Sequence, residues 1–68
     1  MRNNRRTRNT KVFAEVYRDE SGDWRWRARH VTNHRIMADS AEGYRKLRSC
    51  LHGVDVVLGS VEVREVES

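Results

Sequence analysis

The chain has 68 residues, of which 35% are charged and 37% hydrophobic, with a formal net charge of +4 and a single cysteine. This length allows one domain with a small core, and a lone cysteine excludes an intrachain disulfide. No apolar run reaches the roughly 20 residues of a membrane span, and no apolar segment follows the basic N-terminus as in a secretory signal. We therefore expect a small cytoplasmic protein without membrane contact, which relies on a second copy of itself for stability.

The positive charge is concentrated in the first eleven residues, which contain five cations and no acid. We expect residues 1–10 to form a disordered basic tail, because they are polar and lack periodicity, and residues 11–68 to form the domain. Two interpretations of the tail stay open, namely contact with the phosphates of DNA or RNA, or a solubility segment. Its cations are Arg2, Arg5, Arg6, Arg8 and Lys11.

Two strands joined by a turn open the domain. Residues 11–18 are rich in β-branched and aromatic side chains, and residues 24–31 alternate with period two, so both are predicted as strands. Residues 19–23 form a turn cluster in which Gly22 can adopt a positive φ. The length of this turn sets the register of the two strands.

A five-residue loop pairs Arg18 with Trp24 and leaves Glu15 and Tyr17 on the face that carries the arginines. A four-residue loop would instead place Glu15 between the two tryptophans. Burying a carboxylate without a partner costs several kcal/mol, so we predict the five-residue loop.

The second strand points Trp24 and Trp26 to one face and three arginines to the other. We predict that the tryptophans build the core, although stacking on nucleic-acid bases is the alternative. The arginine face is either solvated, with Glu15 as a cross-strand partner and Asp39 as a second candidate, or a phosphate-binding surface. These arginines are Arg25, Arg27 and Arg29.

A short third strand follows a turn at residues 32–34, in which Asn33 is expected to adopt the left-handed conformation. The strand covers residues 35–39, with Ile36 and Ala38 predicted on the inner face.

An apolar stripe then predicts a helix that packs on the sheet. It consists of Leu47, Cys50, Leu51, Val54 and Val57. Gly53 weakens the helix interior, and Gly59 is a suitable C-terminal stop. A final strand is predicted over residues 61–66. The predicted core comprises Val16, Trp24, Trp26, Ile36, Leu47, Cys50, Leu51 and Val54.

The sequence contains no recognisable catalytic, cofactor or metal site. Cys50 lies on the apolar stripe, where a thiol is inert, and His52 projects from a different face of the helix. The remaining histidines, His30 and His34, flank a turn and lack the clustering that zinc requires. We therefore predict that the protein is not an enzyme.

Several segments together resemble the YegP-like family of small uncharacterised proteins, also called domain of unknown function 1508. They are Glu15-Val16-Tyr17-Arg18-Asp19, Gly22-Asp23-Trp24-Arg25-Trp26-Arg27, Ile36-Met37-Ala38-Asp39-Ser40, Glu42-Gly43-Tyr44, Cys50-Leu51 and Gly53-Val54. The resemblance implies an α+β fold built from one β3-α-β unit, with an antiparallel sheet and one helix packed on one face. It also implies that two units share a sheet and exchange their C-terminal strands.

The chain departs from the family pattern in four places, one of which is the Asn-Gly turn of relatives, which appears here as Asn33-His34 with an extra residue. Ala14 stands where relatives often have a large aromatic, which leaves the register around Phe13 open. Arg45 and Lys46 stand where relatives often have a capping serine, and the basic tail has no family counterpart.

Because only one unit is present, we expect a homodimer whose exchanged strand contains Val61, Val63 and Val66. The resemblance carries no established activity, so the predicted function is that of a non-catalytic interaction or structural module. The alternative is an accessory nucleic-acid-binding protein that contacts phosphates through the tail and the Arg25, Arg27 and Arg29 face.

Overall fold

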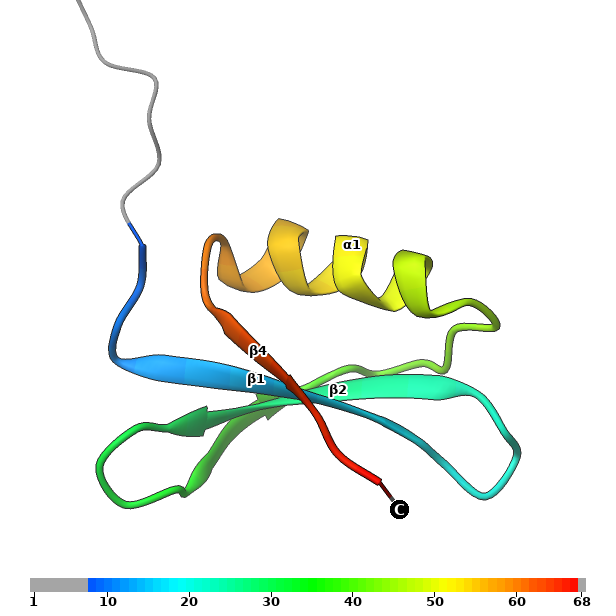
Figure 1. Ribbon diagram of the computed structural model, residues 1–68, viewed down its shortest axis with the longest axis horizontal. Helices are drawn as coiled ribbons and strands as arrows, with labels where there is room; N and C mark the ends of the chain where they lie inside the picture. Colours follow the sequence, from blue (N-terminus) through cyan, green and yellow to red (C-terminus); the bar gives the residue numbers. More distant parts are fainter. Residues whose placement is uncertain (1–7, 68) are drawn as a thin grey trace, which may run out of the picture.

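The computed structural model describes residues 8–67, which form four strands and one helix. The elements are β1 (Val12–Arg18), β2 (Trp24–His30), β3 (Ile36–Asp39), α1 (Leu47–Leu58) and β4 (Glu62–Glu65). The helix covers one face of the sheet, and no other helix of the described residues covers the opposite face, here called the open face (Figure 1). The predicted α+β class and the order β-β-β-α-β are confirmed.

The sheet has the strand order β3-β2-β1-β4 and is mixed. The pairs β1–β2 and β2–β3 are antiparallel, whereas β4 runs parallel to β1. The prediction of an antiparallel sheet is therefore wrong for the last strand. The reason is the helix: α1 carries the chain back across the sheet from the end of β3, so that β4 enters in the same direction as β1 (Figure 1).

The register of β1 and β2 confirms the five-residue loop. Arg18 pairs with Trp24, and Glu15 pairs with Arg27. Asp19 organises the loop, because its Oδ1 accepts hydrogen bonds from the backbone N–H groups of Ser21 and Asp23 at 2.9 and 3.0 Å. Gly22 has a φ of 86°, as predicted, which this turn requires and which side chains disfavour.

The turn between β2 and β3 differs from the prediction. His34, not Asn33, adopts the left-handed conformation, with a φ of 62°. The side chain of Asn33 instead caps the turn, since its Oδ1 accepts a hydrogen bond from the backbone N–H of Arg35 at 2.9 Å. Asparagine therefore serves as a local acceptor here, and the positive φ moves to the next residue.

An irregularity in β3 also corrects the predicted position of Ile36. Ala38 pairs with Ala28, but Ile36 rather than Met37 pairs with Arg29, so one extra residue is inserted in β3. Because side chains alternate between faces, this insertion places Ile36 at a register position of the open face. Its side chain is 54% exposed and does not belong to the core, contrary to the prediction.

The helix begins after Lys46, which makes no side-chain capping hydrogen bond, and ends at Gly59, with φ of 80°. Gly59 donates its N–H to the carbonyl of Asp55 at 2.9 Å, as a helix stop does. The buried helix positions are Cys50 and Val54. Leu51 and Val57, predicted on the buried stripe, are 37% and 62% exposed. The stripe of the helix that contacts the sheet is therefore narrower than the apolar stripe predicted from the sequence.

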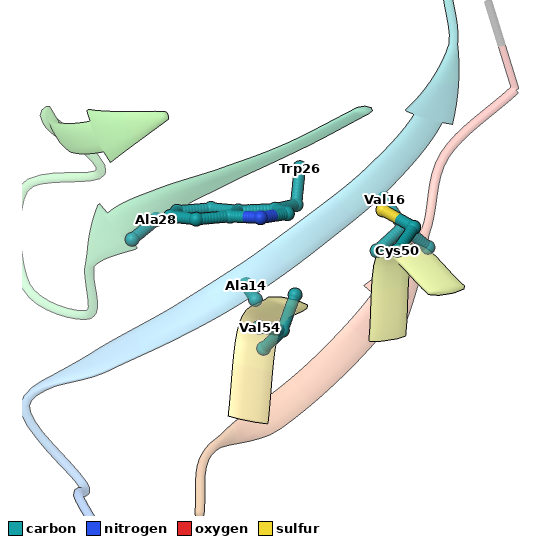
Figure 2. Close-up of a cluster of buried hydrophobic side chains, with 6 residues drawn as sticks. All are labelled: Ala14, Val16, Trp26, Ala28, Cys50 and Val54. Carbon is teal, nitrogen blue, oxygen red and sulfur yellow. The ribbon is translucent and has the colours of Figure 1, made fainter. Parts of the chain in front are cut away.

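The core lies between α1 and the face of β1 and β2 that carries the tryptophans. Figure 2 shows Cys50 and Val54 of the helix packed toward side chains of these two strands. The buried cluster consists of Ala14, Val16, Trp26, Ala28, Cys50 and Val54. Trp24 and Leu47 pack against it and are partly buried. Apart from Ile36 and Leu51, every predicted core residue is therefore in or against this cluster.

Candidate functional site

The arginines of β2 lie on the open face, and each of them is bound to a carboxylate. Nε of Arg27 and Nε of Arg29 both donate to Oε1 of Glu15 at 2.7 Å. Nε of Arg25 donates to Oδ2 of Asp19 at 2.6 Å. The interpretation of this face as locally neutralised thus has direct geometric support. Asp39 occupies the register position opposite Arg27.

The ion pairs move the pKa values of the two carboxyl groups. Partial burial alone would raise the pKa of Glu15, but the hydrogen bonds and charges of Arg29 and Arg27 outweigh this effect and hold the pKa below its ordinary value. The pKa of Asp19 is also lowered, mainly by the hydrogen bond from Arg25 and then by the loop N–H of Asp23. Folding therefore favours the ionised form of both carboxyl groups.

Guanidinium groups also cover the aromatic rings of the open face. The guanidinium carbon of Arg64 lies 3.9 Å from the ring centroid of Phe13, and that of Arg27 lies 4.5 Å from the ring of Tyr17. His34 contacts Phe13 edge-on, with the ring centroids 5.6 Å apart. Phe13 is only 2% exposed as a result. The guanidinium of Arg64 and the ring of His34, rather than a second protein layer, cover this side chain.

Sequence reasoning missed Arg64 as part of this face. Its neighbour Val63 is the register partner of Ala14, whose side chain lies on the core face. Arg64 must therefore point to the open face, where its register partner in β1 is Glu15. The alternation of residues 61–66 in the sequence already indicated that Arg64 and the valines point to opposite faces. The register that brings Arg64 to Phe13, however, depends on the parallel pairing of β4.

Tyr44 joins the start of α1 to the sheet. It exchanges two backbone hydrogen bonds with Trp24, at 2.7 and 2.8 Å, and packs against the core cluster. A Cβ at Gly53 would lie 2.6 Å from Oη of Tyr44, so the absence of a side chain in the middle of the helix makes room for this ring. The indole Nε1 of Trp26 is buried near the same point without a hydrogen-bond partner in the described residues.

A second glycine contact connects the two loops at the same end of the sheet. A Cβ at Gly43 would lie 2.7 Å from Cβ of Asp23 and 2.9 Å from its Oδ2. The Glu42-Gly43-Tyr44 and Gly22-Asp23-Trp24 segments, about 20 residues apart in the sequence, are therefore packed against each other. The two motifs therefore have a structural reason to occur together. Gly43 lets its backbone lie close to Asp23, and Tyr44 forms a short β-bridge with Trp24.

The predicted dimer strand forms one edge of the sheet. Val61 and Val66 are partly buried, Val63 is 41% exposed, and the backbone N–H of Val66 donates to the carbonyl of Val16 at 2.9 Å. A shallow groove of about 450 Å³ separates β4 from the helix. It is lined by Leu51, Val54, Asp55, Gly59, Ser60, Val61 and Val63, and we call it the α1–β4 groove.

Cys50 and His52, the thiol and the imidazole of α1, differ in exposure. The thiol of Cys50 is fully buried, which raises its pKa, whereas His52 is exposed. Residues 8–67 contain no group of three or more His, Cys, Asp or Glu side chains able to hold a metal ion. In the same range, no helix has the length and apolar character needed to cross a membrane. A second hollow of about 340 Å³, next to Trp24 and Arg18, is bordered by the segment of residues 65–67.

Only part of the basic tail is described. Arg2, Arg5 and Arg6 lie outside the described residues, whereas Arg8 and Lys11 are exposed and precede β1. Between them, Asn9 donates its backbone N–H to the carbonyl of Ser60 at 2.8 Å. The chain just before β1 therefore runs beside the segment that leads into β4.

Comparison with known proteins agrees with these features. The profile of the domain of unknown function DUF1508 matches residues 19–67. A UPF0339 protein of Neisseria meningitidis serogroup B is 34% identical over 56 residues, which cover 82% of this chain and 96% of the relative. A UPF0339 protein of serogroup A of the same species gives the same identity and coverage. No solved structure matches the chain significantly. The chain therefore belongs to the DUF1508 family, also described as the UPF0339 or YegP-like proteins.

Proposed function

We propose that the protein is a non-catalytic, homodimeric interaction module whose two copies join along the α1–β4 side and exchange their β4 strands. The observation that carries this proposal is the apolar α1–β4 groove beside an edge strand. Leu51 and Val63 border this groove and are 37% and 41% exposed. A second copy that covers these side chains removes apolar surface from water and pairs the open strand edge.

The small size of the core supports the same proposal. Seven hydrophobic residues are buried in the described part of the chain, and two of these are alanines. Domains of this length bury only about 60% of the surface that their unfolded chain exposes, so self-association supplies stability that one copy lacks.

Strand exchange is supported by the short connection before β4. The helix ends at Leu58 and β4 begins at Glu62, so three residues join them. In the exchanged dimer, β4 would make the same parallel pairing with β1, but between copies. Short hinge segments invite exchange between copies, and β4, which pairs with β1 of its own chain in the single copy, would make that pairing with the partner's β1 instead.

The dimer interface is tested by light scattering on matched charge substitutions. We expect L51E and V63E to convert the dimer into a monomer, because each places a carboxylate in the α1–β4 groove. V56E is the control, since Val56 is 67% exposed on the same helix but does not line the groove. Equal effects of all three variants, or a wild-type chain that is monomeric at micromolar concentration, would contradict the proposal.

The exchange itself is tested by lengthening the connection. Insertion of Gly-Ser-Gly after Gly59 should let β4 close on its own β1 and shift the protein to a monomer. The same insertion after Gly22, in the β1–β2 loop, should leave the dimer intact. If the first insertion also leaves a dimer, the copies associate through the groove without exchanging strands.

A further inference from the structure

β4 presents different side chains to the two faces of the sheet. On the core face Val63 is the register partner of Ala14, and on the open face Arg64 is the register partner of Glu15. In a single copy these contacts lie within one chain. In the exchanged dimer proposed above, β1 of one copy receives β4 of the other, so each contact joins two copies. The side chains of β4 that contact β1 therefore determine which strand can be received.

The core face alone does not define how β4 pairs with β1. Val61 and Val63 are two residues apart and lie on the same face of the strand. A slip by one residue would turn both valines to the open face. A slip by two residues, however, would set Val61 opposite Ala14 and still present an apolar side chain to the core. The pairing therefore needs a second determinant.

That determinant lies on the open face, where Arg64 covers Phe13. The guanidinium carbon is 3.9 Å from the ring centroid, and Phe13 is only 2% exposed although no helix of residues 8–67 packs on this face. Nε of Arg64 also donates to Oε2 of Glu62 at 2.7 Å, which holds the guanidinium in place. A two-residue slip would move Arg64 about 7 Å along β1 and uncover the ring of Phe13.

Charge favours the same register. Residues 60–68 contain one cation, Arg64, and three acids. After the two-residue slip Glu62 would stand opposite Glu15, where the two carboxylates repel each other. In the observed register the pKa of Arg64 is raised, mainly by the hydrogen bond to Glu62 and also by the charge of Glu15.

We propose that Arg64 is the residue through which one copy recognises β4 of the other, by stacking on the partner's Phe13 in the register that sets it opposite the partner's Glu15. This inference rests on the strand exchange of the proposed function. It identifies the received strand by its chemistry: valine toward the core and a cation two residues after an acid on the open face. A second copy of this chain supplies such a strand.

The test is the composition of mixed dimers. F13L removes the ring and R64Q removes the charge, so neither homodimer retains the contact. In an exchanged heterodimer of these two variants, Arg64 of the first chain covers Phe13 of the second, and one contact is regained. One variant is labelled with heavy nitrogen, and the two are mixed in urea and refolded. Native mass spectrometry should then show the heterodimer about 2- to 5-fold above random assortment.

Y17L and R27Q form the matched control pair. The guanidinium carbon of Arg27 lies 4.5 Å from the ring centroid of Tyr17 on the same face. These residues belong to β1 and β2, which stay in one chain when β4 is exchanged. Neither variant can therefore restore the contact of the other, and this mixture should assort at random.

A second mixture pairs the wild type with the double variant F13L/R64Q. Only the wild-type homodimer retains the contact between copies, so the heterodimer should fall about 2- to 5-fold below random assortment. Circular dichroism verifies that each variant keeps the wild-type fold. Random assortment in both Phe13–Arg64 mixtures, with dimers present, would overturn this inference and leave the homodimer of the proposed function standing. A monomeric wild type would overturn both.

Discussion

Substitution of Gly53 by alanine should have two opposing effects on the stability of the fold. It improves helix propensity, but it brings a new methyl group against Tyr44. In an ordinary helix interior, alanine is more stable than glycine by about 1 kcal/mol. At position 53, however, the new Cβ would lie 2.6 Å from Oη and 3.1 Å from Cζ of Tyr44, which two backbone hydrogen bonds to Trp24 hold in place. Inserting a methyl group into a packed site costs about 1–3 kcal/mol. We therefore expect G53A to lower the free energy of unfolding by about 1 kcal/mol.

The control is the same substitution in a Y44F background, where the nearest atom of the ring is Cζ rather than Oη. There the helix propensity of alanine should offset most or all of the packing cost, so the double-mutant cycle should give a coupling energy of about 1 kcal/mol. The free energies come from urea denaturation followed by tryptophan fluorescence at one protein concentration. If G53A stabilised both backgrounds by the same amount, the proposed contact between Tyr44 and the helix would be refuted.

Three further predictions concern the open face, the core and the loop contact. E15Q should lower stability by about 1–3 kcal/mol. Because folding lowers the pKa of Glu15, its contribution is present above the ordinary value of 4.5 and is lost as pH falls through the lower folded value, so acid titrations of E15Q should lose this part of the pH dependence. Cys50 should react with a thiol reagent only after unfolding, and rapid reaction of the native protein would contradict its burial. G43A should destabilise the protein through its contact with Asp23, and D23G in the same chain should restore most of the loss, as measured by thermal unfolding.

The sequence pattern predicts the parts of the fold that depend on alternation. The assignment of Trp26 and Val16 to the core, and of Glu15 to the arginine face, follows from period two and from the cost of a buried carboxylate. The end of the helix at Gly59 follows equally from a local rule, because the position just after the last helical turn favours glycine.

The parts that the sequence does not predict depend on backbone details with small energy differences. The extra residue in β3 and the positive φ of His34 rather than Asn33 are choices between neighbouring conformations, and each changes which side chain reaches which face.

The burial of Phe13 has a different cause. The alternation of β1 places Phe13 on the other face of the sheet from Ala14. No helix of the described residues packs on that face. Its burial depends on the guanidinium of Arg64 and the ring of His34, which come from two distant segments. A sequence rule that assigns burial only to the helix-covered face cannot find such a residue.

The most direct test of the account is the molar mass of the full chain in solution, measured by light scattering over a range of micromolar concentrations. The account predicts twice the chain mass of 8.1 kDa for the wild type and for V56E, and 8.1 kDa for L51E and for the Gly-Ser-Gly insertion after Gly59. A wild-type mass of 8.1 kDa at every concentration, with a stable fold by circular dichroism, would contradict it.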